Sequence, residues 1–217
     1  MFTGVIFGII SGVLGLVVLI IIGIAKQILA RLRDRLKGNK FLKEIVPAVV
    51  AAVTIGTINW VLPLTTGNGL LVTTYIVKYG AGGESDNEEL VAVNILVWTA
   101  LARAFTLGLS MSCGFVGGFV YPILTIGILV GSIVHRWFDY LPMGLCISCF
   151  TVSIASSVVP TPITMTLLST MLFFLGAYQT VPVFVSVITS YFVLGGTGLF
   201  KRLQERGGNL HLFTSLY

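Results

Sequence analysis

The feature that most constrains the fold is the start of the chain, which is apolar and carries no charge from Val5 to Ile24. About 20 consecutive apolar residues are enough for a helix to cross a bilayer. No basic segment precedes this stretch, and a basic segment rather than a small-residue cleavage pattern follows it. We therefore expect a membrane helix over residues 3–29 that is retained in the protein, with the basic segment as its stop.

The composition and the placement of charge agree with a membrane protein. Charged residues make up 10% of the 217 residues, whereas soluble domains carry about 25%. The basic residues cluster at 26–43 and 201–206, beside apolar segments, which is typical of cytoplasmic anchors. This distribution argues against nucleic acid as a partner. The acidic loop at 80–89 is expected on the opposite side of the membrane.

Further apolar segments predict an integral, multi-pass, all-α protein with tilted and broken helices. The stretch 141–175 is too long for one crossing and is interrupted by Pro160 and Pro162. Pro47 suits the first turn of its helix, and residues 65–69 predict a turn. The other expected apolar segments are 47–64, 70–77, 90–112, 123–138 and 181–194.

Broken helices at membrane depth suggest anion handling. Freed backbone groups must line a polar cavity or be buried in protein, and transporters aim the N-termini of half-helices at anionic groups. The segment 112–122 is the strongest local case, because its glycines allow the backbone to turn before Pro122 opens a helix. The alternative interpretation is a stretch of small residues used for helix packing.

This segment resembles the Gly-x-Phe-x-Pro signature of the CLC family of chloride channels and chloride/proton exchangers, which falls on residues 118–122. Residues 3–10 and 62–69 resemble the family's long helix and next corner, and Pro182 matches a later helix-start proline. Residues 159–164 resemble its Arg-x-Pro-Leu-Thr segment, and 181–198 resemble the helix leading to the inner pore mouth. The resemblance implies one inverted-repeat half of the CLC fold, with a transmembrane domain over 1–206 and a polar tail over 207–217.

The resemblance also implies an anion site at the start of this helix. The backbone amides of Phe119 and Val120 would bind the anion, Gly117 and Gly118 would let the backbone turn, and Phe200 falls where the family has a tyrosine hydroxyl. Val120 replaces the signature phenylalanine, and a proline replaces the arginine of the Arg-x-Pro segment. We therefore expect anion binding that is weaker or less selective than in the family.

The implied function is a chloride channel or chloride/proton exchanger, with chloride as the transported ion and no other cofactor. The family's gating glutamate and central serine come from its first half and have no counterpart here, since neither Glu44 nor Glu205 matches them. We expect a partial chain, completed by a separate first-half chain or by missing sequence. The expected partners are a small anion, membrane lipid and a second copy in a homodimer. The alternative function is a non-transporting assembly or regulatory subunit.

Other residues indicate no catalysis. No catalytic constellation or metal site is predicted, so we do not expect an enzyme. Cys146 and Cys149 form a Cys-x-x-Cys pair within an apolar stretch, and we interpret them, with Cys113, as small buried residues rather than a metal or redox site. Arg103 lies inside an apolar segment and is expected to face the pore or to pair with a backbone carbonyl.

Overall fold

Helices form the whole regular structure of the residues that a computed structural model describes, which are 2–35, 40–67, 74–75, 91–115, 118–138, 140–159 and 161–196. No strand occurs within these ranges. The elements are α1 (Phe2–Arg35), α2 (Lys40–Val61), the short 3₁₀ helix η1 (Pro63–Thr65), α4 (Val93–Ser112), α5 (Val120–Trp137), α6 (Met143–Val158), α7 (Pro162–Leu172) and α8 (Ala177–Gly196).

Among the described residues, five helices are long and apolar enough to cross a bilayer: α1, α2, α4, α5 and α8. The 16 residues of α6 span about 24 Å, which is less than the hydrocarbon core of about 30 Å. Its neighbour α7 has 11 residues and is shorter still. Helix α6 ends at Val158 and α7 begins at Pro162. This confirms the helix interruption expected from the prolines. The protein is therefore an integral, multi-pass membrane protein with broken helices.

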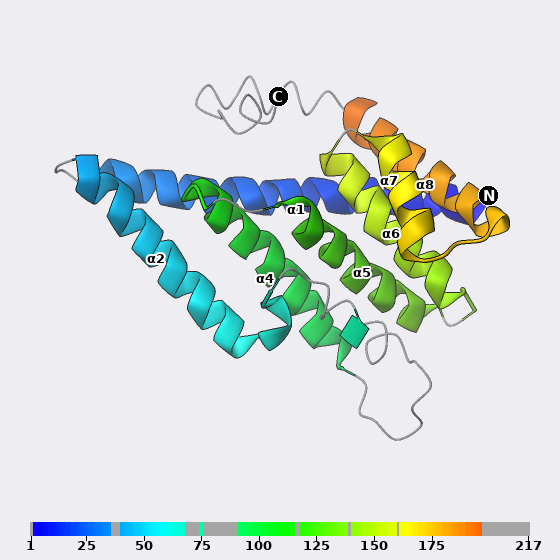
Figure 1. Ribbon diagram of the computed structural model, residues 1–217, viewed down its shortest axis with the longest axis horizontal. Helices are drawn as coiled ribbons and strands as arrows, with labels where there is room; N and C mark the ends of the chain where they lie inside the picture. Colours follow the sequence, from blue (N-terminus) through cyan, green and yellow to red (C-terminus); the bar gives the residue numbers. More distant parts are fainter. Residues whose placement is uncertain are drawn as a thin grey trace.

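Helix α6 is the centre of the packing. Every residue from Cys146 to Ser157 is buried, and α1, α5, α7 and α8 all contact this helix. The ring centroids of Phe7 on α1 and Phe150 on α6 lie 5.0 Å apart. Helix α1 runs along one side of the whole molecule, from α8 near the N-terminus to α2 at its other end (Figure 1). One hydrophobic cluster, which includes Phe7 and Phe150, thus joins the first helix to the last four.

Glycines allow the closest helix contacts. A Cβ atom placed on Gly131 of α5 would lie 2.6 Å from the Cα atom of Ile147, and one on Gly127 would collide with the backbone of Thr151. On α1, a Cβ atom on Gly4 would lie 2.5 Å from the carbonyl oxygen of Pro182 on α8. Small residues at a spacing of four let membrane helices approach in this way.

Hydroxyl groups add polar contacts within the core. The Oγ atoms of Ser153 on α6 and Ser186 on α8 are 2.7 Å apart. The Ser190 hydroxyl donates a hydrogen bond of 2.8 Å to the backbone carbonyl of Ser153. Such bonds between membrane helices contribute about 0.6 kcal/mol each on average. They connect α8 to α6 in addition to the apolar packing.

Two prolines lie elsewhere in their helices than the sequence suggested. Pro47 was expected in a first turn, but α2 begins at Lys40 and Pro47 lies inside it. Pro182 was expected at a helix start, but α8 begins at Ala177. In both cases the helix extends at least one turn before the proline, at the cost of one backbone hydrogen bond. The expectation for Pro122 was correct, because it lies in the first turn of α5.

Candidate functional site

The segment that precedes the site begins with the turn at the C-terminus of α4. The backbone N–H of Cys113 donates to the carbonyl of Leu109 at 3.1 Å, and that of Phe115 donates to Ser110 at 3.2 Å. Between them, Gly114 has a φ of +73°, a conformation that glycine adopts without strain. A left-handed residue with these bonds is a common way to end a helix. This turn ends α4.

The start of α5 carries three of the predicted site residues. Gly118 and Phe119 precede the helix, and Val120 is its first residue. No side chain caps this end, and the first turn contains no acidic residue. Its first N–H groups have no partner in the helix itself, and Pro122 has none to offer. The helix itself therefore supplies no partner for the N–H groups of Phe119, Val120 and Tyr121, of which the first two are the predicted donors.

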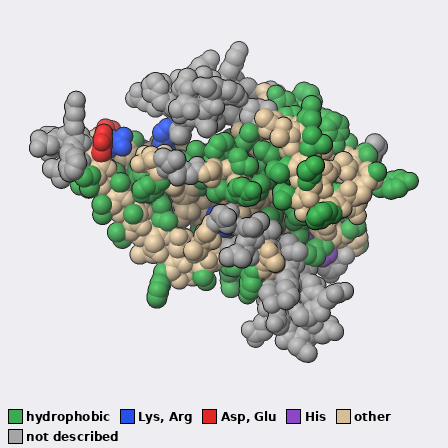
Figure 2. Space-filling view, viewed as in Figure 1, with side chains coloured by type: hydrophobic (Ala, Val, Ile, Leu, Met, Phe, Trp, Pro, Cys, Tyr) green, Lys and Arg blue, Asp and Glu red, His purple; other side chains and the backbone are tan. Residues whose placement is uncertain are grey.

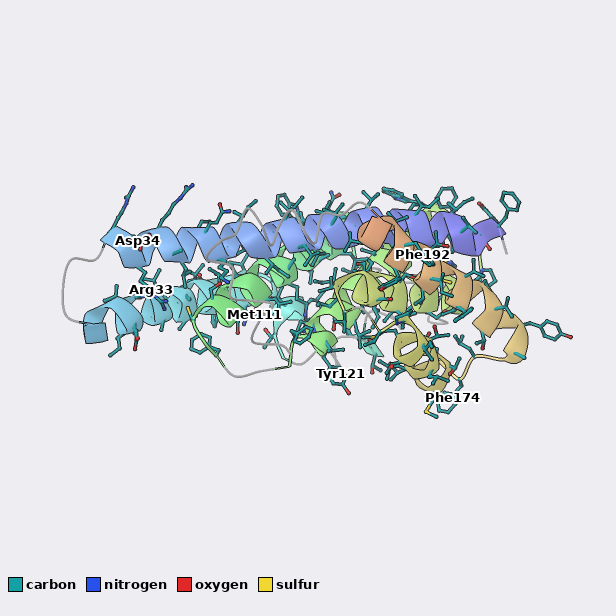
Figure 3. All side chains as sticks on the ribbon, turned by 90° about the horizontal axis from the view of Figure 1, so that it is seen from above. Arg33, Asp34, Met111, Tyr121, Phe174 and Phe192 are labelled. Carbon is teal, nitrogen blue, oxygen red and sulfur yellow. The ribbon has the colours of Figure 1, made fainter. Side chains whose placement is uncertain are left out.

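Apolar packing fixes this end of α5. The side chains of Phe119 and Val120 are half-buried and pack against the main hydrophobic core, and Ile123 in the next turn is 1% exposed. Tyr121 is 56% exposed and points away from the helices (Figure 3). The core thus fixes the side chains of Phe119 and Val120. The backbone N–H groups of these residues take no part in this apolar packing.

An uncapped helix end of this kind can hold an anion. A helix N-terminus carries the equivalent of about half a positive charge together with free N–H donors. The basic residues His135 and Arg136 lie in the last turn of α5, at the negative end of the dipole. The first turn has no charged side chain. Its charge is the partial positive charge of the helix N-terminus.

Two described glycines near the site do not pack against another helix of the described part of the chain. Nothing lies within 4 Å of the Cβ positions of Gly114 and Gly118. The glycines that do pack closely are elsewhere, for example Gly127 and Gly131 on α5. These two glycines therefore make none of the close helix contacts within the described residues that the helix-packing interpretation of the 112–122 segment expects. The packing glycines still matter for the site, because they seat α5 against α6.

Not every predicted residue can be placed. Gly117, Pro160 and Phe200 lie outside the residues that the structure describes. Gly118, Phe119 and Val120 are brought together because they are consecutive at one helix end.

Arg103 pairs with backbone carbonyls, one of the two alternatives expected for it. Its side chain is 3% exposed. The guanidinium donates to the carbonyl of Leu64 at 3.2 Å and to that of Gly67 at 2.8 Å. Both carbonyls belong to the corner around η1, and Gly67 has a φ of +78°, as expected for a turn. Arg103 thus connects the middle of α4 to this corner.

Two of the three cysteines are buried, as interpreted from the sequence, whereas the third is not. Cys146 and Cys149 are both 0% exposed, and Cys113 is half-buried. The Cys113 thiol lies 3.6 Å from the Pro47 carbonyl. Burial raises the pKa of this thiol, although Arg33 nearby lowers it in part. Within the described ranges, no three His, Cys, Asp or Glu side chains are placed to hold a metal ion.

A groove of about 540 Å³ lies between α1, α2 and α4. Its lining is apolar and includes Ile21, Ile58, Trp98 and Phe105. Its lining residues carry two polar side-chain groups, the indole N–H of Trp98 and the hydroxyl of Thr57, which already donates to the carbonyl of Thr54 at 2.9 Å. The groove therefore offers little to an anion, and the helix end at Val120 remains the better candidate.

The fold and the site define a class of protein. Crossing helices, a broken helix pair and an uncapped helix end are features of membrane channels and transporters. The family model for the voltage gated chloride channel matches residues 1–195. The chain belongs to this family, which confirms the resemblance seen in its signature segment. No curated protein sequence matches the chain.

Proposed function

We propose that the chain takes part in moving chloride or another small anion across the membrane, with the anion held at the start of α5. The amides of Phe119 and Val120 would donate to the ion, while Gly117 and Gly118 keep side chains away from it. Family membership supports the class of function. The single observation that carries the site is the uncapped N-terminus of α5, where the side chains of Phe119 and Val120 pack against the core.

The physical chemistry of such a site suits transport. A hydrogen bond from an amide to a charged partner contributes about 1.5–3 kcal/mol. A full buried cation could hold the ion too tightly for release, and conduction requires binding that is weak enough to reverse. The partial charge of a helix end provides moderate binding. The amides would therefore bind an anion reversibly, with an affinity moderate enough to allow its release.

Two departures from the family pattern weaken the proposed site. Val120 keeps its amide but lacks the aromatic ring of the signature, and its side chain is half-buried in the core. Phe200 replaces a tyrosine and has no hydroxyl to donate. We propose that anion binding is correspondingly weaker or less selective. Passive permeation or exchange with protons would both require residues that another chain or further sequence supplies.

A homodimer is part of the proposal. The exposed side of α7 presents Ile163, Leu167 and Met171, which are 58–77% exposed and spaced four residues apart. Phe174, just after α7, and Phe192 on α8 are 93% and 66% exposed (Figure 3). We propose that these two helices contribute to the contact between subunits, and that the other exposed apolar surfaces face lipid.

The test removes one proposed donor without changing any side chain. Replacing the amide of Val120 by an ester deletes its N–H. Anion affinity should fall about tenfold to a hundredfold, because one bond to a charge is lost. The matched control is the same replacement at Ile163 in the first turn of α7, where the N–H is also free of a helix partner. Equal loss at both positions would contradict the proposed site.

A second function is favoured by the same departures. If the valine at 120 and the phenylalanine at 200 abolish useful binding, the chain would act as a non-transporting assembly or regulatory subunit. We expect weak chloride flux at best from the purified chain alone in liposomes. Robust, saturable chloride efflux would exclude the regulatory alternative, whereas no anion binding by the unmodified chain would favour it.

A further inference from the structure

The first helix is longer than a bilayer crossing requires. Its 34 residues extend about 51 Å, against a hydrocarbon core of about 30 Å. The first charged residue after the start is Lys26. Residues 26–35 then carry four basic side chains and a single acidic one, Asp34. The end of α1 therefore reaches the level of the lipid headgroups.

One exposed stripe of α1 changes from apolar to basic at this level. The side chains of Ile20, Ile24 and Ile28 are 48–49% exposed. Continuing at helical spacing, the same stripe reaches Arg31 and Arg35, which are also exposed. At 1.5 Å per residue, Ile20 lies about 16 Å from Arg31 along the axis, which is close to half of the hydrocarbon thickness.

The other two basic residues lie on the opposite side of the helix. Lys26 and Arg33 share the stripe of Ile22 and Leu29. The side chains of Ile22 and Leu29 are buried against the neighbouring helices, whereas Lys26 is half-buried and Arg33 is exposed. Arg33 is close enough to Cys113 to affect its thiol electrostatically, and it lies on the side of α1 that faces α2 (Figure 3). Charged side chains gather at this end of the molecule (Figure 2).

We propose that the stripe formed by Ile20, Ile24, Ile28, Arg31 and Arg35 binds an anionic phospholipid. One acyl chain lies along the three isoleucines, and the phosphate pairs with the two arginines. Among the described residues no ion pair engages either arginine, so both are available to a lipid phosphate. A basic cluster that directly follows a membrane helix attracts anionic lipids by about 1 kcal/mol for each Lys or Arg.

A second copy of the chain fits this stripe less well than a lipid does. Two copies of α1 packed in parallel along it would bring Arg31 and Arg35 of both copies together. Like charges at such a contact are destabilising. A phosphate has the opposite sign and an acyl chain matches the isoleucines. Charge complementarity therefore favours an anionic lipid, and this inference does not depend on anion transport.

The experiment places a fluorescent reporter on the stripe. The three native tryptophans are replaced (Trp60→Phe, Trp98→Phe and Trp137→Phe), and Ile24→Trp supplies the only indole. The chain is reconstituted in neutral phosphatidylcholine vesicles with rising fractions of brominated phosphatidylglycerol or brominated phosphatidylcholine, and quenching is measured. We expect the anionic lipid to be preferred, by about fivefold for each arginine.

Matched double variants test the assignment. Arg31→Gln with Arg35→Gln should abolish the preference. Lys26→Gln with Arg33→Gln removes the same charge from the opposite side and should leave the preference within about twofold. Arg31→Lys with Arg35→Lys keeps the charge and should keep the preference, which covers the case in which the glutamine variant does not fold.

Three outcomes would overturn the proposal. The first is no preference for the anionic lipid in the reporter chain. The second is an equal loss in both glutamine pairs, which would indicate a diffuse effect of net charge. The third is the absence of quenching by either brominated lipid, which would mean that protein covers the stripe. As a check without substitutions, spin-labelled phosphatidylglycerol should be immobilised on the unmodified chain more than spin-labelled phosphatidylcholine, and equal immobilisation would also count against the site.

Discussion

The guanidinium of Arg103 donates a 2.8 Å hydrogen bond to the backbone carbonyl of Gly67, which stands 36 residues earlier in the chain. A second bond of 3.2 Å reaches the carbonyl of Leu64. This buried cation therefore satisfies two carbonyls of the corner after α2. Hydrogen bonds of this kind are needed wherever irregular backbone lies at membrane depth.

The first prediction concerns this link. Arg103→Leu loses two charge-assisted hydrogen bonds of about 1.5–3 kcal/mol each. It also removes the unfavourable free energy of placing a charge in the membrane, about 2.5–3.5 kcal/mol on insertion scales. We expect a net destabilisation of about 1–2 kcal/mol, measured by unfolding in mixed micelles. The control Arg31→Leu removes an exposed charge and, in micelles without anionic lipid, should change stability by less than about 0.5 kcal/mol. Equal stability of Arg103→Leu and the native chain would show that the link contributes nothing.

The second prediction concerns glycine contacts. Gly127→Ala places a methyl group against the backbone of Thr151, which cannot move aside as a flexible side chain can. We expect a destabilisation of about 1–3 kcal/mol from this overpacking. The control is Gly56→Ala in α2, which meets nothing within 4 Å and should stabilise its helix by up to about 1 kcal/mol. The same unfolding measurement serves both, and a stabilising effect of Gly127→Ala would contradict the close approach.

Much of the fold could be predicted from apolar length and proline position. The break near Pro162 and the helix start near Pro122 follow from the missing N–H and the fixed φ of proline. Pro47 and Pro182 show the limit of that rule. A proline one turn or more into a helix removes a single hydrogen bond, and packing of the remaining residues can offset that loss.

Contacts between residues far apart in the chain could not be predicted from the sequence. Spacing does not separate Gly127, which packs against α6, from Gly56, which meets open space. The difference depends on which helix face meets a neighbour. The candidate site was easier, because Gly118, Phe119 and Val120 are consecutive in the chain. That Phe119 packs in the core while Tyr121 points outward required the tertiary structure.

The third prediction concerns the position proposed to close the anion site. If Phe200 replaces the family's tyrosine, Phe200→Tyr adds a hydroxyl donor and should tighten chloride binding about tenfold to a hundredfold. Calorimetric titration of a transport-competent assembly measures this. Phe2→Tyr adds the same hydroxyl to an exposed position on α1 and should leave affinity unchanged. Unchanged affinity for Phe200→Tyr would count against the placement of Phe200.

The fourth prediction concerns thiol reactivity. Cys146 and Cys149 are fully buried, and the thiolate is the reactive form of cysteine. Neither should react with a maleimide until the protein unfolds. Cys113 should react slowly in the native state, because it is partly accessible but burial raises its pKa. Raising the pH should speed its labelling, since more thiolate forms. Mass spectrometry after timed labelling reads each site, and native-state labelling of Cys149 would contradict the packing of α6.

The fifth prediction concerns the contact between Gly15 on α1 and Ser157 on α6. A Cβ atom on Gly15 of α1 would collide with the Oγ atom of Ser157 on α6, and would lie 2.9 Å from the Cβ atom of Ser157. Gly15→Ala alone should therefore destabilise the protein by about 1–3 kcal/mol.

Ser157→Gly removes both colliding atoms, so the double variant should lose less stability than the two single changes combined. We expect a favourable coupling of at least about 1 kcal/mol in a double-mutant cycle. The pair Gly23→Ala and Ser157→Gly serves as the control, because Gly23 has open space at its Cβ position and its effect should simply add. Additive effects for Gly15→Ala and Ser157→Gly would mean that α1 and α6 do not meet at this point, and the seating of α1 on α6 would then need another contact.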